Sequence, residues 1–98
     1  MDNSTALSRL RALEPELRNS GVATLYLFGS LARGEARNES DVDLYFEQQS
    51  GRRLSLLDVI GIRQFLEDRL SLPVDLILRD SLHPLLRADI EAEAIPVF

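Results

Sequence analysis

The sequence predicts an α/β (α+β) fold, in which a small mixed β-sheet is packed with helices in a single domain covering residues 1–98. Three apolar runs of strand length, at residues 22–28, 41–47 and 74–78, alternate with stretches whose apolar residues recur every three or four positions. This order of helix, strand, short helix, strand, helix, strand and helix is typical of a sheet with helices packed against it. A length of 98 residues favours one domain with one modest core.

The N-terminal segment predicts a helix followed by a break. Its apolar residues recur at spacings of four and three and share one helical face: Ala6, Leu10, Leu13 and Leu17. Ser4 is the expected N-cap. Pro15 lacks an N–H, so we expect it to kink this helix or to start a second one near Glu14.

A short helix over residues 30–33 and a polar turn over residues 35–40 connect the first two predicted strands. This connection is close to the lower limit of about a dozen residues for a parallel crossover. We therefore expect the two strands to run antiparallel, which brings Gly29 and Ser30, at the end of the first strand, beside Asp41 at the start of the second.

The predicted helix after the second strand begins with a capping box, since Ser55 is followed three residues later by Asp58. Its apolar stripe is expected to consist of Leu56, Val59, Ile62, Leu66 and Leu70. Gly61, inside this helix, lowers its stability by about 1 kcal/mol relative to alanine, which suggests close packing at that position.

The C-terminal segment predicts one more helix and an extended end. Ser81 is the expected cap of a helix that reaches about Ala92. Residues 95–98 are expected to be extended, because the residue before Pro96 is restricted to extended conformations. His83, the only histidine, follows this cap and is assigned no catalytic role, since nothing places it beside Ser30 and hydrolase chemistry is not supported.

Composition and charge exclude several functions. The formal net charge is -5 and the eleven basic residues, all arginine, are dispersed, which argues against direct nucleic-acid binding and fits a basic protein partner. The absence of cysteine excludes disulfides, zinc–thiolate sites and thiol nucleophiles. No apolar run approaches 18 residues and no secretory signal is visible, so we expect a cytoplasmic protein that does not cross a membrane.

Two aspartates in the second predicted strand carry the strongest chemical signal. Asp41 and Asp43 lie on one face because side chains alternate, while the apolar Val42 and Leu44 lie on the other. Two adjacent negative charges are unfavourable unless a positive charge lies between them, and a divalent metal ion is the usual solution. The alternative is an ordinary strand face exposed to water.

The residues after the first strand suit a phosphate. Gly29 lets the backbone approach a bulky ligand, and the following N–H groups and the Ser30 hydroxyl can hold phosphate oxygens. The alternative is an ordinary strand-to-helix turn with a serine cap. Arg33 shares a helical face with Ser30 and could reach a triphosphate. We favour instead a structural pairing with an acidic neighbour in the loop: Glu35, Glu39 or Asp41.

Asp75 lies inside an apolar run, where a carboxylate needs a reason to be buried. If the third strand pairs beside the second, Asp75 completes a cluster of three carboxylates with Asp41 and Asp43. Such a cluster would hold two Mg²⁺ ions roughly 4 Å apart. The alternative is an edge strand whose aspartate points outward.

These residues resemble a known family. Gly29-Ser30, ten intervening residues and Asp41-Val42-Asp43 are similar to the G-S-x(10)-D-x-D motif of the DNA polymerase beta-like nucleotidyltransferases. The fuller stretches, residues 28–34 and 40–44, resemble the minimal nucleotidyltransferase (MNT) branch. The resemblance extends to residues 74–76 and to the C-terminal segment, so it covers nearly the whole chain without departures at the motif positions.

The resemblance implies the nucleotidyltransferase fold and a metal-dependent transfer of a nucleoside monophosphate, AMP from ATP, with two Mg²⁺ ions. It implies that Gly29 and Ser30 bind the β- and γ-phosphates of the nucleotide. Arg33, from its position on the same helical face as Ser30, is a further candidate for binding the nucleotide. The resemblance also implies that Asp41 and Asp43 hold the metals, and that Asp75 holds the catalytic metal and helps to activate the acceptor hydroxyl. In-line transfer needs little beyond positioning and charge neutralisation.

The resemblance also implies a partner. Family members of this size resemble antitoxins that pair with a HEPN-domain ribonuclease toxin in a hetero-oligomer and add AMP to one of its tyrosines. Because the chain ends soon after the third strand, we expect the acceptor site to come from another molecule. One alternative is an antitoxin that acts only by binding. Another is nucleotidyl transfer to a small molecule or RNA, against which the missing basic surface argues.

Overall fold

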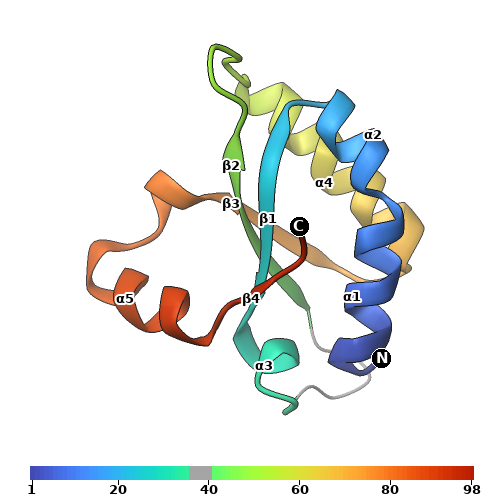
Figure 1. The fold of residues 1–98 in the computed structure, drawn as a ribbon, viewed down its shortest axis with the longest axis vertical. Helices are drawn as coiled ribbons and strands as arrows, with labels where there is room; N and C mark the ends of the chain where they lie inside the picture. Colours follow the sequence, from blue (N-terminus) through green and yellow to red (C-terminus); the bar gives the residue numbers. More distant parts are fainter. Residues whose placement is uncertain (36–40) are drawn as a thin grey trace.

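The computed structural model describes residues 1–35 and 41–98, and it consists of a four-stranded sheet with helices on both faces (Figure 1). The predicted turn over residues 35–40 lies almost entirely outside the described residues. The elements are α1 (Asn3–Ala12), α2 (Glu14–Asn19), β1 (Val22–Phe28), α3 (Gly29–Ala32), β2 (Val42–Gln48), α4 (Leu56–Leu70), β3 (Val74–Leu78), the 3₁₀ helix η1 (Arg79–Ser81), α5 (Pro84–Glu93) and β4 (Ile95–Pro96). None of the helices in the described ranges is long and apolar enough to cross a membrane.

The sheet is mixed, as predicted, with the strand order β3-β2-β1-β4. β1 and β2 pair antiparallel, which confirms the expectation from their short connection. β2 and β3 pair parallel, with the fifteen-residue helix α4 in the crossover between them. The extended C-terminal segment adds β4 antiparallel to the free side of β1, a pairing for which the sequence provided no signal.

The two faces of the sheet carry cores of different size. Helices α1, α2 and α4 cover one face, and α5 lies over the other (Figure 1). The larger core contains the buried leucines of the three helices and the side chains of the strands that point toward them. The smaller core consists of Phe28, Tyr45 and Leu82, with Ile90 and Ala94 of α5 packed against it. The smaller core matters for function because it lies on the face that carries the aspartates.

The N-terminal helices differ from the prediction at one cap. The carboxylate of Asp2 accepts a hydrogen bond from the Thr5 N–H at 2.7 Å and caps α1, so the predicted cap Ser4 lies inside the first turn. Either residue type can cap a helix, and Asp2 lies one residue before the helix as an N-cap must. Pro15 lies in the first turn of α2, which confirms the prediction of a second helix near Glu14.

Helix α4 begins with the predicted capping box: the Asp58 N–H donates to Ser55 at 3.1 Å, and the Ser55 N–H donates to Asp58 at 2.9 Å. Ile62, Leu66 and Leu70 are buried as predicted. Leu56 is 76% exposed, so its assignment to the stripe was wrong. At 3.6 residues per turn it falls at the margin of the stripe. The prediction of close packing at Gly61 was also wrong, because a Cβ there would meet nothing within 4 Å.

The last helix begins later than predicted. Ser81 belongs to η1, and α5 starts at Pro84 with His83 as its cap, whose ring nitrogen Nδ1 accepts from the Leu85 N–H at 3.2 Å. The proline decides this boundary, since it suits the first turn of a helix and forces the preceding residue to be extended. His83 therefore has a structural contact, and no catalytic role is assigned to it.

Candidate active site

Three strands place the candidate residues in one row. Phe28 of β1 lies opposite Asp43 of β2, and Asp43 lies opposite Asp75 of β3. Residues that are directly paired point to the same face of a sheet, so the carboxylates of Asp43 and Asp75 are neighbours. The condition on which Asp75 was assigned to the site, pairing of the third strand beside the second, is confirmed. β3 is also the edge strand and Asp75 is exposed, so the site is open on that side.

The electrostatics of this row centre on Asp43. Burial raises the pKa of the half-buried Asp43 carboxyl, and the negative charges of Asp75 and then Asp41 raise it further. The positive charge of Arg33 lowers the same pKa in part. Asp41 itself is exposed and lies just before β2. The ionised form of Asp43 is therefore disfavoured by its surroundings, and a nearby cation would stabilise it.

The resemblance to the nucleotidyltransferases implies magnesium ions at these carboxylates. Over residues 1–35 and 41–98, no group of three or more histidine, cysteine, aspartate or glutamate side chains is arranged closely enough to hold a metal ion. The donor set nevertheless suits Mg²⁺, which prefers carboxylate oxygens. The mutual repulsion that raises the pKa of Asp43 is what a cation would relieve. The chemistry of the carboxylates therefore fits Mg²⁺.

Gly29 is required at its position for two reasons. Its φ angle is +77°, in the left-handed region that L-residues with side chains rarely adopt. In addition, a Cβ built on Gly29 would overlap the Asp43 carboxylate. The turn from β1 into α3 thus brings the glycine backbone directly against Asp43. Ser30 follows immediately in α3, so the predicted phosphate turn and the carboxylates are adjacent in space.

Arg33 forms two ion pairs. Its Nε donates to Glu35 at 3.0 Å, and its Nη1 donates to Glu93 at 2.9 Å. The predicted pairing with Glu35 is confirmed, whereas Glu39 lies outside the described residues. The hydrogen bonds to Glu93 and then to Glu35 raise the pKa of the Arg33 guanidinium. In this structure Arg33 is thus held by carboxylates at the rim of the site.

Glu93 is a site residue that the sequence did not indicate. One of its carboxylate oxygens accepts from the Gly29 N–H at 3.1 Å and the other accepts from Arg33. The pairing of β4 with β1 explains this position, since Leu27 lies opposite Ile95 in the antiparallel register. Two residues beyond this pair, past the ends of both strands, lie Gly29 at the start of α3 and Glu93 at the end of α5, which therefore come close together. Only knowledge of that pairing could have pointed to Glu93.

Helix α5 is fixed independently of Glu93. Arg79 pairs with Glu91 of α5 and, at 3.1 Å, with Glu47 of β2. Glu91 also accepts from Arg87 at 3.1 Å, one turn earlier in the helix. Tyr45, stacked on Tyr26 with ring centroids 4.7 Å apart, belongs to the smaller core against which Ile90 of α5 packs. These contacts hold α5 over the sheet while its last residue, Glu93, reaches the Gly29 turn.

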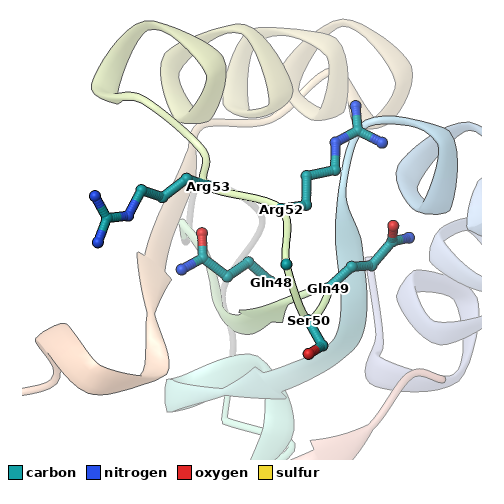
Figure 2. Close-up of a pocket in the computed structure, with 6 residues that line it drawn as sticks. Gln48, Gln49, Ser50, Arg52 and Arg53 are labelled. Carbon is teal, nitrogen blue, oxygen red and sulfur yellow. The ribbon is translucent and has the colours of Figure 1, made fainter.

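A separate hollow of about 370 Å³ lies in the loop between β2 and α4, lined by residues 48–53 (Figure 2). Arg52 and Arg53 point in different directions from this loop (Figure 2). The loop lies at the opposite end of the sheet from α3 (Figure 1). It contributes no residue to the row of aspartates, so it is not part of the candidate site.

Comparison with known proteins shows which family the chain resembles. The sequence profile of a family described as nucleotidyltransferase domain matches residues 8–97. A Methanocaldococcus jannaschii protein with the provisional name of protein adenylyltransferase is 39% identical over 87 residues, which are 89% of this chain and 91% of the relative. Protein adenylyltransferase MntA of Thermococcus cleftensis is 42% identical over 76 residues, which are 76% of this chain and 75% of the relative.

Solved structures share the same fold. A structure described provisionally as a minimal nucleotidyltransferase superposes with a TM-score of 0.81 at 38% identity, covering 98% of this chain and 96% of the other. A complex of tri-AMPylated Shewanella oneidensis HEPN toxin with MNT antitoxin contains a chain with a TM-score of 0.69 at 19% identity, covering 98% of this chain and 71% of the other. At that lower identity the likeness establishes the fold alone.

Proposed function

Because the chain belongs to the nucleotidyltransferase domain family, we propose that it transfers AMP from ATP onto a hydroxyl group of a partner protein. Nucleotidyl transfer is the activity of the family, while the donor, the acceptor and the metal are our proposal. The observation that carries the proposal is the pairing of Asp43 with Asp75 on parallel strands, directly beside the Gly29 turn. This arrangement sets negatively charged side chains next to a turn that can hold phosphates.

In this proposal, Gly29 and Ser30 hold the β- and γ-phosphates of ATP, and Asp41, Asp43 and Asp75 hold two Mg²⁺ ions. Bound Mg²⁺ would supply positive charge to the phosphate oxygens and lower the pKa of the acceptor hydroxyl. The acceptor oxygen forms a bond to the α-phosphorus while the bond to the β-phosphate breaks and pyrophosphate leaves. Asp75 is exposed on the edge strand. In this proposal the acceptor approaches from that open side, and Asp75 helps to activate its hydroxyl.

We further propose that the acceptor is a tyrosine of a HEPN-type ribonuclease toxin and that the transfer makes this protein its antitoxin. The relatives named as protein adenylyltransferases and the likeness in fold to an MNT antitoxin bound to a HEPN toxin support this partner. The formal net charge of -5 fits a basic partner surface. Since the reaction draws on ATP, the proposed location is the cytoplasm.

The test is incubation with ATP labelled on the α-phosphate, Mg²⁺ and the product of the adjacent gene. We expect label on the partner with the wild-type protein and none with Asp43→Asn. Asp68→Asn, an exposed position of α4 with the same change in charge, is the matched control and should transfer normally. No transfer by the wild type, or equal transfer by Asp43→Asn, would refute the proposal.

A second candidate is an antitoxin that neutralises its partner by binding alone. It is favoured by the finding that, in the described part of the chain, no three or more acidic, histidine or cysteine side chains lie close enough together to hold a metal ion. The two candidates differ in the effect of Asp41→Asn combined with Asp43→Asn. If this double variant protects cells from the partner as well as the wild type does, binding is sufficient and catalysis is not needed.

A further inference from the structure

Glu93 occupies hydrogen-bond donors that a nucleotide phosphate would need. Its carboxylate accepts from the Gly29 N–H at 3.1 Å and from Arg33 Nη1 at 2.9 Å. In the proposed function, Gly29 belongs to the turn that holds the triphosphate, and Arg33 stands at its rim. The structure thus shows an anionic group of the protein itself bound where an anionic ligand is expected.

A carboxylate and a phosphate compete for such donors. Both are anions with several acceptor oxygens, and both form charge-assisted hydrogen bonds with backbone N–H groups and guanidinium groups. The Gly29 N–H cannot serve both at full strength, and Arg33 is already shared between Glu35 and Glu93. The Glu93 charge also lies close enough to Asp43 to contribute to its raised pKa. It would repel the phosphates of an incoming nucleotide in the same way.

The hold of Glu93 on these donors is weak enough to be reversible. The side chain of Glu93 is 26% exposed and that of Arg33 is 44% exposed, and ion pairs in such contact with water contribute little. Helix α5 does not depend on this contact, because Arg79 ties Glu91 to Glu47 of the sheet. The Glu93 side chain can therefore leave Gly29 while the helix stays in place.

We propose that Glu93 is a further residue of the nucleotide site, an internal anion that holds the Gly29 N–H and Arg33 until a nucleotide phosphate displaces it. The inference rests on the proposed function, since it takes the Gly29 turn as the phosphate site. It assigns Glu93 the role of lowering nucleotide affinity in the chain alone. It also makes Arg33 available to the phosphates once Glu93 has left.

The test is a calorimetric titration with the Mg²⁺ complex of AMP-PNP, an ATP analogue. We expect Glu93→Gln to bind about fivefold more tightly than the wild type, because the variant keeps the shape of the side chain and loses its charge. Glu16→Gln, at an exposed position of α2, makes the same change in net charge and should bind like the wild type. Thermal unfolding of each variant checks that it is folded.

A second measurement uses the wild-type protein and does not depend on any variant. In an NMR titration with the same ligand, the amide of Gly29 and the carboxyl carbon of Glu93 should shift together with one dissociation constant. A Glu93 signal that stays constant while the Gly29 signal moves would overturn the inference. So would binding by Glu93→Gln that is no tighter than that of the wild type. If the wild type and Glu93→Gln both bind no nucleotide, the proposed function itself fails.

Discussion

Substitution of Gly29 by alanine tests the link between the proposed phosphate turn, Gly29 and Ser30, and the carboxylates. The added Cβ would overlap the Asp43 carboxylate, so the Asp43 side chain has to rotate away or the turn has to open. Either response changes the position of Asp43 relative to Asp75, with which it is paired across the sheet. A substitution of a residue with no side chain of its own is thus expected to act on the carboxylates that are proposed to bind the metal.

The chain contains a matched control for the backbone effect. Gly51 has the same φ angle as Gly29, +77°, and a Cβ added there would meet nothing within 4 Å. Both alanine variants should lose about 1–2 kcal/mol of unfolding free energy from the left-handed backbone alone. For a chain of this size, each kcal/mol corresponds to a fall in Tm of roughly 4–8 °C. Gly29→Ala should lose more than Gly51→Ala, because it also displaces Asp43.

The activities should separate the two variants more sharply than their stabilities. A displacement of about 1 Å at a reacting group lowers the rate roughly 10²-fold, and we expect a loss of that order for Gly29→Ala. Gly51→Ala should transfer label at the wild-type rate, measured below the Tm of both variants. If Gly29→Ala transfers label as fast as Gly51→Ala, the contact between Gly29 and Asp43 does not set the geometry of the site.

Three further predictions concern charge, metal and capping. Because the pKa of Asp43 is raised in the folded state, the stability that its protonated form contributes is lost as the pH rises through that pKa. Asp43→Asn should therefore be more stable than the wild type at neutral pH, by no more than about 1 kcal/mol since water screens the half-buried carboxylate. The difference in unfolding free energy between Asp43→Asn and the wild type, measured by urea denaturation, should vanish below the ordinary pKa of aspartate. Equal stability of the two proteins at neutral pH would contradict the raised pKa of Asp43. Mg²⁺ at about 100 times its Kd should stabilise the wild type by about 2.7 kcal/mol, seen as a rise in Tm, and should stabilise Asp75→Asn less; an equal rise would exclude Asp75 as a ligand. Ser55→Ala should lose about 1 kcal/mol in urea denaturation through the missing capping box, whereas Ser50→Ala in the preceding loop should not; identical midpoints would show that the cap does not contribute.

Much of the fold could be predicted because its signals are local. The start of helix α4 was predictable from Ser55 and Asp58, which are three residues apart, and the side chain of each accepts a hydrogen bond from the backbone N–H of the other. The antiparallel pairing of β1 and β2 followed from a connection too short for a crossover. At α1 the prediction was wrong because two residues near the helix start can both act as a cap, and Asp2 rather than Ser4 does so. At α5 the helix starts at Pro84 rather than after Ser81, because proline is tolerated only in the first turn of a helix.

The residues of the candidate site also differ in whether local sequence signals could predict them. The sequence alone predicted a phosphate-binding turn at Gly29 and Ser30 and a shared strand face for Asp41 and Asp43, because both predictions depend only on chain geometry over a few residues; in the structure Asp41 lies just before β2. Only the tertiary structure decided that Asp75 lies beside Asp43 and that Glu93 reaches Gly29. Those neighbours come from elements far apart in the chain, and the strand register that brings them together depends on packing across the whole sheet. No spacing in the sequence encodes that register.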